Sequence, residues 1–317
     1  GDMAAVDKFK DEVKKKSTTA LIEEGELSEA VSLGGALKLR YEIRYVSSSD
    51  FDSKIKLLRN QENSFENKIV AVVCFAKDDS ESVVLGKKIN DALEDESYKM
   101  IFIDSSTTPL GKDGYDQYCE NMAQSMYYQG KDNNQARQFE ANAKDALKKW
   151  KNRIANGEFI VYTSDNKNGK RATTLDMLYS ELFDIDKKKY KNCLEGEYNV
   201  IDGMYLPNSL KLGVSCGVKQ EVSGTYKSGN PATKLENALG EAWNYNGKYW
   251  VDMPHLLISK IKAKVEELIS CAFEESGRIS ISDIYDELKG EPFGFMPCNL
   301  SAFVIGFILK EYADGTY

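Results

Sequence analysis

Histidine and proline are scarce in this sequence, with one His and six Pro among 317 residues. Ser-His-Asp and Cys-His catalysis both use a His as the base, so any such site would depend wholly on His255. This residue follows Pro254 at the start of an apolar segment, where a surface or capping role is the simpler interpretation. No motif nominates a Ser or Cys partner, so we predict no catalytic triad.

Paired cysteines and long apolar runs are also missing. The six Cys are scattered without C-x-x-C spacing, and with a single His they predict no metal site. Reduced thiols in a cytoplasmic protein are the expected state. No window approaches 18 consecutive apolar residues, so we predict no membrane-spanning helix and no membrane partner.

Both glycine-rich nucleotide signatures are absent as well. The chain contains neither G-x-x-x-x-G-K-[S/T] nor G-x-G-x-x-G, and Gly169-Lys170-Arg171 lacks the leading glycine of a phosphate loop. We therefore predict no cofactor.

Apolar runs of strand length alternate with helical segments over residues 37–194. Continuous apolar runs such as Lys68–Ala76 are typical of strands buried on both faces. Four strands are predicted, at residues 37–46, 68–76, 99–104 and 158–163. This order predicts a Rossmann-like α/β domain with an open, mostly parallel sheet and a helical hairpin inserted at 112–156.

Three further regions flank or follow this domain. Residues 1–36 are expected to form an N-terminal helical segment, and residues 195–253, rich in Gly and Tyr, a connector. Residues 254–317 are predicted to form a helical, winged-helix-like α+β domain.

The winged-helix prediction depends on three elements. A short strand is expected at 277–281, then a helix with Ser282 as its N-cap, then an apolar helix over 299–312. The turn Ala313-Asp314-Gly315 follows, with two more residues after it. We interpret this as an unfinished wing, so we expect the chain to be a piece of a larger protein.

Acidic residues follow two of the predicted strands. Asp78 and Asp79 come after the first buried strand, and Asp104 ends the next. In open α/β sheets ligands bind at the carboxyl ends of the strands, so these residues predict a pocket there. Asp104 also resembles the metal-binding Asp of an ATPase strand, but without a phosphate loop a turn-capping role is simpler. A phosphoacceptor site would need a matching strand-end Lys, which we do not find.

A basic segment stands out in a chain of net charge −8. Residues 131–191 hold fourteen Lys and Arg against nine Asp and Glu, a net charge of +5. A solvated helix face is the default interpretation, and a phosphate or nucleic-acid contact surface is the sharper hypothesis. The candidate contact residues are Lys144, Lys148, Lys151, Arg153, Lys170 and Arg171.

The C-terminal region has the opposite balance. Residues 254–317 hold six Lys and Arg against ten Asp and Glu. The helix predicted at 299–312 shows almost no Arg, Lys, Asn or Gln with which to contact base edges. We therefore expect this region to hold protein partners rather than to bind DNA.

The same region is similar to a known family. Ile281–Leu288, then Pro292-Phe293-Gly294-Phe295, then an apolar helix ending Leu309-Lys310-Glu311-Tyr312 resemble a segment of large P-loop ATPases from bacterial phage-defence islands, the BREX type among them. The stretch with Asp104, Pro109-Leu110-Gly111, Trp150 and Gly157-Glu158-Phe159 is similar in kind. The resemblance implies a non-catalytic segment that couples an upstream motor to DNA or to partner proteins. Because the phosphate loop is absent, no ATPase residue is implied here.

Two hypotheses follow from the sequence. The first is a non-enzymatic interaction module within a larger ATPase-type polypeptide, contacting DNA through the basic segment. The second is a stand-alone α/β enzyme or phosphate-ligand-binding protein with its site near Asp104.

Overall fold

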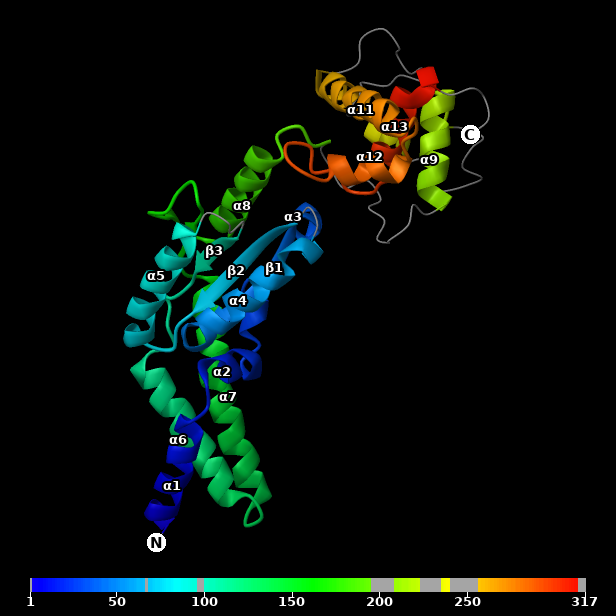
Figure 1. Cartoon of the computed structure of the whole chain (residues 1–317). Coiled ribbons are helices and arrows are strands. Elements are labelled where there is room, and N and C mark those ends of the chain that lie inside the picture. Colours follow the sequence, from blue (N-terminus) through cyan, green and yellow to red (C-terminus); the bar gives the residue numbers. More distant parts are fainter. Residues whose placement is uncertain are drawn as a thin grey trace. The chain divides into compact units, whose positions relative to one another are not determined.

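The computed structural model describes residues 2–65, 68–95, 100–194, 208–222, 235–239 and 256–312 (Figure 1). The chain forms two units, Gly1–Asp184 and Ile185–Tyr317, and the boundary falls inside the helix α8, Leu175–Lys189. Residues 1–36, which we expected as a segment of their own, belong to the first unit.

Within the described part of the first unit, one five-stranded sheet has the strand order β1-β2-β3-β4-β5. Its strands are β1 (Tyr41–Ser47), β2 (Ile69–Phe75), β3 (Ile101–Asp104), β4 (Phe159–Tyr162) and β5 (Lys170–Ala172). The pairs β1–β2 and β2–β3 are parallel, whereas β3–β4 and β4–β5 are antiparallel. Four of the five strands therefore share one direction, and the predicted open, mostly parallel sheet is confirmed.

The direction of β4 departs from the crossover pattern that the sequence suggests. Helix α6 (Lys112–Tyr128) leads away from the carboxyl edge of β3, and α7 (Asn133–Ala155) returns to it. Beside this return, the Thr107 hydroxyl donates to the carbonyl of Glu158 at 2.9 Å. Because two successive helices bring the chain back to the edge it left, the next strand must run the opposite way.

Helices cover both faces of the sheet. Helices α4 (Phe51–Gln61) and α5 (Asp79–Glu94) pack on one face, against Val70, Val72 and Cys74 of β2. On the other face, the Phe75 ring meets Trp150 of α7 edge-on, with ring centroids 6.3 Å apart. Side chains alternate between faces along a strand. Coverage on both faces therefore explains why all seven residues of β2 are apolar and buried.

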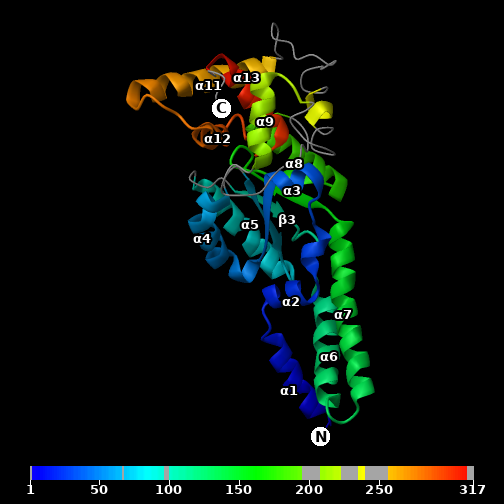
Figure 2. The same cartoon turned by 90° about the vertical axis from the view of Figure 1, so that its right-hand side faces the viewer.

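A helical arm, made of α1 (Asp2–Lys14), α6 and α7, projects from the carboxyl edge of the sheet (Figures 1 and 2). Ser125 of α6 donates to the carbonyl of Ala136 on α7 at 2.8 Å, and Lys10 of α1 pairs with Glu120 of α6 at 3.2 Å. Helical spacing in the sequence predicts an inward apolar stripe on α7, formed by Ala136, Phe139, Ala143, Leu147, Trp150 and Ile154. The stripe faces inward, apart from the half-buried Phe139. Its buried residues are Ala136, Ala143, Leu147, Trp150 and Ile154.

The strand predicted at 37–46 is wrong in its first half. Residues Gly35–Arg40 form the helix α3, and β1 begins at Tyr41. Tyr41 pairs with Ile69, the first residue of β2. Residues 37–40 therefore have no ladder partner, and a short alternating stretch without a partner strand forms a helical turn instead.

The described part of the second unit is helical. Its main helices are α9 (Asn208–Lys219), α11 (Leu256–Glu275), α12 (Ile281–Leu288) and α13 (Asn299–Leu309). Residues 299–308 of α13 are all buried, and α9, which lies in the expected connector, packs against it. Most of the expected connector lies outside the described residues, as do His255 and the turn at 313–315.

The strand predicted at 277–281 and the cap predicted at Ser282 are wrong. Ser280 is the N-cap of α12: its hydroxyl accepts from the amide of Asp283 at 3.0 Å, and its own amide donates to the Asp283 carboxylate at 3.2 Å. This capping box satisfies backbone groups at the helix start. The winged-helix-like end is therefore not confirmed by the described residues, although its apolar helix is present as α13.

Short helical segments complete the description. They are α2 (Thr18–Glu24), η1 (Leu27–Ala30), η2 (Ser48–Asp50), η3 (Glu62–Phe65) and η4 (Lys310–Tyr312). None of the helices described has the length and apolar character that crossing a bilayer requires.

Candidate functional site

The three acidic residues of the predicted pocket have different surroundings in the structure. Asp104, at the end of β3, is buried, and its carboxylate accepts from the amide of Ser106 at 2.8 Å. Burial raises the pKa of Asp104, and the hydrogen bonds from Ser106 oppose this rise in part. Asp78 is the N-cap of α5, accepting from the amide of Glu81 at 3.0 Å, while Asp79 is exposed.

The carboxyl edge of the parallel strands is closed by α2. The hydroxyl of Thr18 donates to both carboxylate oxygens of Glu81, at 2.8 and 3.1 Å. The amide of Lys77, just past β2, donates to the same carboxylate at 2.7 Å. Glu81 therefore joins α2 to the loop at the end of β2, across the place where an α/β ligand would enter.

A second set of hydrogen bonds closes the end of β1. Thr19 of α2 donates to the Asp50 carboxylate at 2.5 Å and lies 2.8 Å from the Ser47 hydroxyl. Ser47 ends β1 and donates to Asp50 through both its hydroxyl and its amide, at 2.8 and 3.1 Å. The polar groups at this strand end thus bind one another.

The end of β3 is closed in the same way. Ser105 donates to the carbonyl of Cys74 through its amide at 3.0 Å and its hydroxyl at 2.6 Å. Ser82 of α5 donates to the carbonyl of Ser106 at 3.0 Å. Burial raises the pKa of the Cys74 thiol, so this cysteine is not a prepared nucleophile. The edge where sequence reasoning placed a pocket is an internally satisfied polar layer.

Two of the six predicted basic contact residues lie on β5, in ion pairs. Lys170 pairs with Glu181 of α8 at 2.6 Å, and Arg171 pairs with Glu158 at 2.9 Å. Each of these two basic side chains therefore has a carboxylate beside it.

Two more are engaged at the base of the arm. Lys151 pairs with Glu29 at 3.2 Å. Arg153 donates from its guanidinium to the carbonyls of Pro109 and Leu110, at 3.0 and 3.1 Å. Arg153 therefore fixes the end of α7 against the loop that follows β3, which is a structural role.

The remaining two, Lys144 and Lys148, belong to the outward face of α7. Lys144 forms a surface pair with Glu140 at 3.2 Å, and Lys148 has no ion pair or hydrogen bond to any residue that the structure describes. One acidic residue occurs among the exposed α7 positions, and the others are basic, amide or Ala. The exposed residues are Asn133, Asn134, Gln135, Arg137, Gln138, Ala141, Lys144, Asp145, Lys148, Lys149, Asn152 and Arg153.

Sequence reasoning on charge alone missed Arg137 and the amide side chains on this face. The sequence pattern that could have predicted this face is its helical spacing. Positions on the side of α7 away from the buried stripe recur at intervals of three or four residues, at Asn134, Arg137, Ala141, Lys144 and Lys148. This outward face presents cations and amides, the side chains that contact phosphates and base edges.

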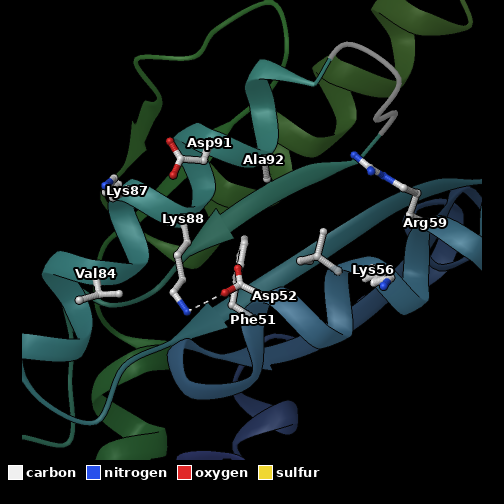
Figure 3. A pocket seen from close by; sticks show the side chains of 10 residues that line it. Phe51, Asp52, Lys56, Arg59, Val84, Lys87, Lys88, Asp91 and Ala92 are labelled. Carbon is white, nitrogen blue, oxygen red and sulfur yellow. Dashed lines mark hydrogen bonds and ion pairs between the residues drawn. The ribbon is translucent and has the colours of Figure 1, made fainter.

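A groove between α4 and α5 was not predicted. It encloses about 580 Å³ on the face of the sheet opposite α7 (Figure 3). Its lining residues are Phe51, Asp52, Ile55, Lys56, Arg59, Val84, Lys87, Lys88, Asp91 and Ala92. The residues come from two separate crossover helices, so only the parallel packing of those helices brings them together.

Within the described ranges, no group of three or more His, Cys, Asp or Glu side chains is placed to hold a metal ion. Comparison of the chain with protein-family models, with curated proteins and with solved structures finds no match.

Proposed function

We propose that this chain is a non-catalytic interaction module and that the outward face of α7 binds DNA. The observation that carries the proposal is the composition of that face. Apart from Arg153, which binds backbone carbonyls, it has four basic and five amide side chains against two acidic ones, Glu140 and Asp145. Phosphate contacts by Lys and Arg dominate DNA affinity, and amide side chains add hydrogen bonds to phosphates or base edges. The N-terminal part of α7 lies in the arm that projects from the sheet (Figure 2).

The ion pairs on this face do not prevent binding. Lys144–Glu140 and Lys149–Asp145 are exposed pairs four residues apart on one helix. Such pairs stabilise a helix by only about 0.3–0.5 kcal/mol, so phosphate oxygens can replace the carboxylates. Arg137 and Lys148 have no ion-pair partner within the described residues.

The enzyme alternative has less support. A pocket at the strand ends would need open space beside Asp104, and Thr18, Thr19 and Ser105 occupy this edge with hydrogen bonds of their own.

The wider setting of the module is also a proposal. The resemblance to phage-defence ATPases favours a cytoplasmic module in a larger polypeptide, with a motor supplied elsewhere in that protein. A winged-helix-like organisation of residues 254–317 stays part of this proposal, with α11, α12 and α13 as its helices and protein partners as its ligands.

DNA binding by charge-reversed variants tests the proposal. Arg137→Glu with Lys148→Glu should weaken binding of a fluorescein-labelled duplex by about tenfold or more at low salt, because two phosphate contacts become repulsive. Lys170→Glu with Arg171→Glu is the matched control, with the same change in net charge on β5 instead of α7. Equal losses in the two double variants, or no binding by the parent chain, would overturn the assignment.

A further inference from the structure

The groove between α4 and α5 is a second surface with its own chemistry. Lining positions recur at helical spacing along both of its walls, over residues 52–59 of α4 and 84–92 of α5. At a rise of about 1.5 Å per residue, each wall runs for about 11–12 Å. Figure 3 shows the two helices side by side, with the strands of the sheet behind them.

The floor of the groove is apolar. Phe51 and Ile55 of α4 are buried at its base, and Ala92 of α5 packs beside them. Val84, near the start of α5, lines the groove with 49% of its surface exposed. Covering this side chain would remove apolar surface from water, which favours association.

The rim is cationic within an acidic protein. Four of the ten lining residues are Lys or Arg and two are Asp. Lys88 pairs with Asp52 across one end at 3.3 Å (Figure 3), and Arg59 pairs with Asp95.

Two rim lysines remain available, one on each wall. Lys56 of α4 and Lys87 of α5 are exposed, and neither forms an ion pair with the residues that the structure describes. An apolar floor between these two cations is complementary to a ligand with an apolar stripe flanked by carboxylates.

We propose that this groove binds an acidic amphipathic helix of a partner protein. Helices pack by fitting the side-chain ridges of one into the grooves of another, and recognition of a helix in a groove relies on apolar anchors at intervals of three or four residues. The groove is long enough for about two turns of such a helix. Nucleic acid would use the lysines and leave the apolar floor without a counterpart.

This inference is independent of the DNA proposal. The groove and the outward face of α7 lie on different helices, on opposite sides of the sheet. Loss of one activity therefore does not imply loss of the other.

A designed peptide probes the groove on the full chain. The probe is a fluorescein-labelled helical peptide of about 14 residues, or about 21 Å, with Leu and Ala on one face and Glu on the other. Its counterpart has Lys at every Glu position. Fluorescence anisotropy should show saturable binding of the acidic peptide, with the basic peptide weaker by about tenfold or more, because like charges face each other at the rim.

Two valines form the matched pair of variants. Val84→Glu places a carboxylate inside the groove and should weaken binding of the acidic peptide by about tenfold or more. Val83→Glu adds the same charge one position earlier, on a side chain that is 76% exposed and does not line the groove, and should leave binding within about twofold. Lys56→Glu with Lys87→Glu should act as Val84→Glu does, and circular dichroism would confirm that each variant is folded.

The opposite results would overturn the inference. These are no saturable binding of the acidic peptide, equal binding of the two peptides, or equal losses in Val84→Glu and Val83→Glu. Displacement of the acidic peptide by a DNA duplex, with the same dependence on Lys56 and Lys87, would assign the groove to nucleic acid and also overturn it.

Discussion

Thr18 and Glu81 are separated by 63 residues in the chain, yet the Thr18 hydroxyl donates to both oxygens of the Glu81 carboxylate. This contact holds α2 across the carboxyl edge of the sheet, the edge that commonly binds ligands in open α/β folds. The chain thus uses an N-terminal helix to close the place where sequence reasoning expected a pocket.

Replacing Thr18 should weaken this closure. Thr18→Val removes the donor while keeping a similar shape, and should lower the free energy of unfolding by about 1–3 kcal/mol, the cost of a lost hydrogen bond to a charged group. Urea denaturation of the full chain measures the change. Thr18→Ser keeps the hydroxyl and should lose less, so equal losses in the two variants would mean that the hydrogen bond contributes nothing.

Asp104 should make stability depend on pH in a definite direction. Burial raises its pKa in the folded chain, whereas an unfolded Asp titrates near pH 3.9. Below that pH both states are protonated and this group costs no stability. As the pH rises the unfolded chain ionises first, so stability is lost until the raised folded pKa is passed.

Asp104→Asn should therefore remove that loss. The Asn amide can still accept from Ser106, and the variant should be at least as stable as the parent at neutral pH. Urea denaturation between pH 3 and pH 7 should show that the free energy of unfolding of Asp104→Asn depends less on pH than that of the parent. The control is Asp79→Asn, at an exposed position near the same edge. A steeper fall in the stability of Asp104→Asn at high pH would contradict the assignment.

Two glycines set the spacing of α9 and α13 in the second unit. A Cβ on Gly217 would lie 2.0 Å from the carbonyl oxygen of Phe303, and a Cβ on Gly306 would lie 2.0 Å from that of Val214. Gly217→Ala or Gly306→Ala should therefore force the helices apart and destabilise the chain by roughly 1–3 kcal/mol or more.

The control for these substitutions is Gly86 on α5, where an added Cβ would meet no atom within 4 Å. Gly86→Ala should stabilise the chain by about 0.5–1 kcal/mol, since Ala favours the helix and restricts the unfolded chain. Thermal unfolding of the three variants separates the cases. Stabilisation by all three would show that α9 and α13 do not need the close approach.

Salt dependence gives a further test of the α7 face. The logarithm of DNA affinity should fall linearly with the logarithm of salt concentration, with a slope of about 0.9 for each phosphate contact. Arg137→Ala with Lys148→Ala should reduce the magnitude of that slope by about 1.8, the equivalent of two phosphate contacts. Lys170→Ala with Arg171→Ala should leave the slope nearly unchanged. Anisotropy titrations at several salt concentrations measure both slopes, and parallel lines for the parent and the α7 variant would refute the contact.

Local patterns predicted much of the scaffold. The apolar run at 68–76 predicted a strand buried on both faces, and the spacing of Ala143, Leu147, Trp150 and Ile154 predicted the inward stripe of α7. These predictions were correct because the spacing of apolar residues along the chain depends directly on whether an element is buried on one face or on both. The strand at 277–281 failed because a few alternating residues fit a capped helix start equally well.

Contacts between distant segments could not be predicted in this way. The pairing of Lys170 with Glu181, the closure by Thr18 and Glu81 and the groove between α4 and α5 all depend on where separate elements lie in space. The sequence by itself determined which faces are apolar and where positive charge accumulates. Only the tertiary structure decided which charges form ion pairs, which strand edge is closed and which groove stays open. The reason is that ion pairs and cavity walls require residues far apart in the chain to lie within a few ångströms of one another.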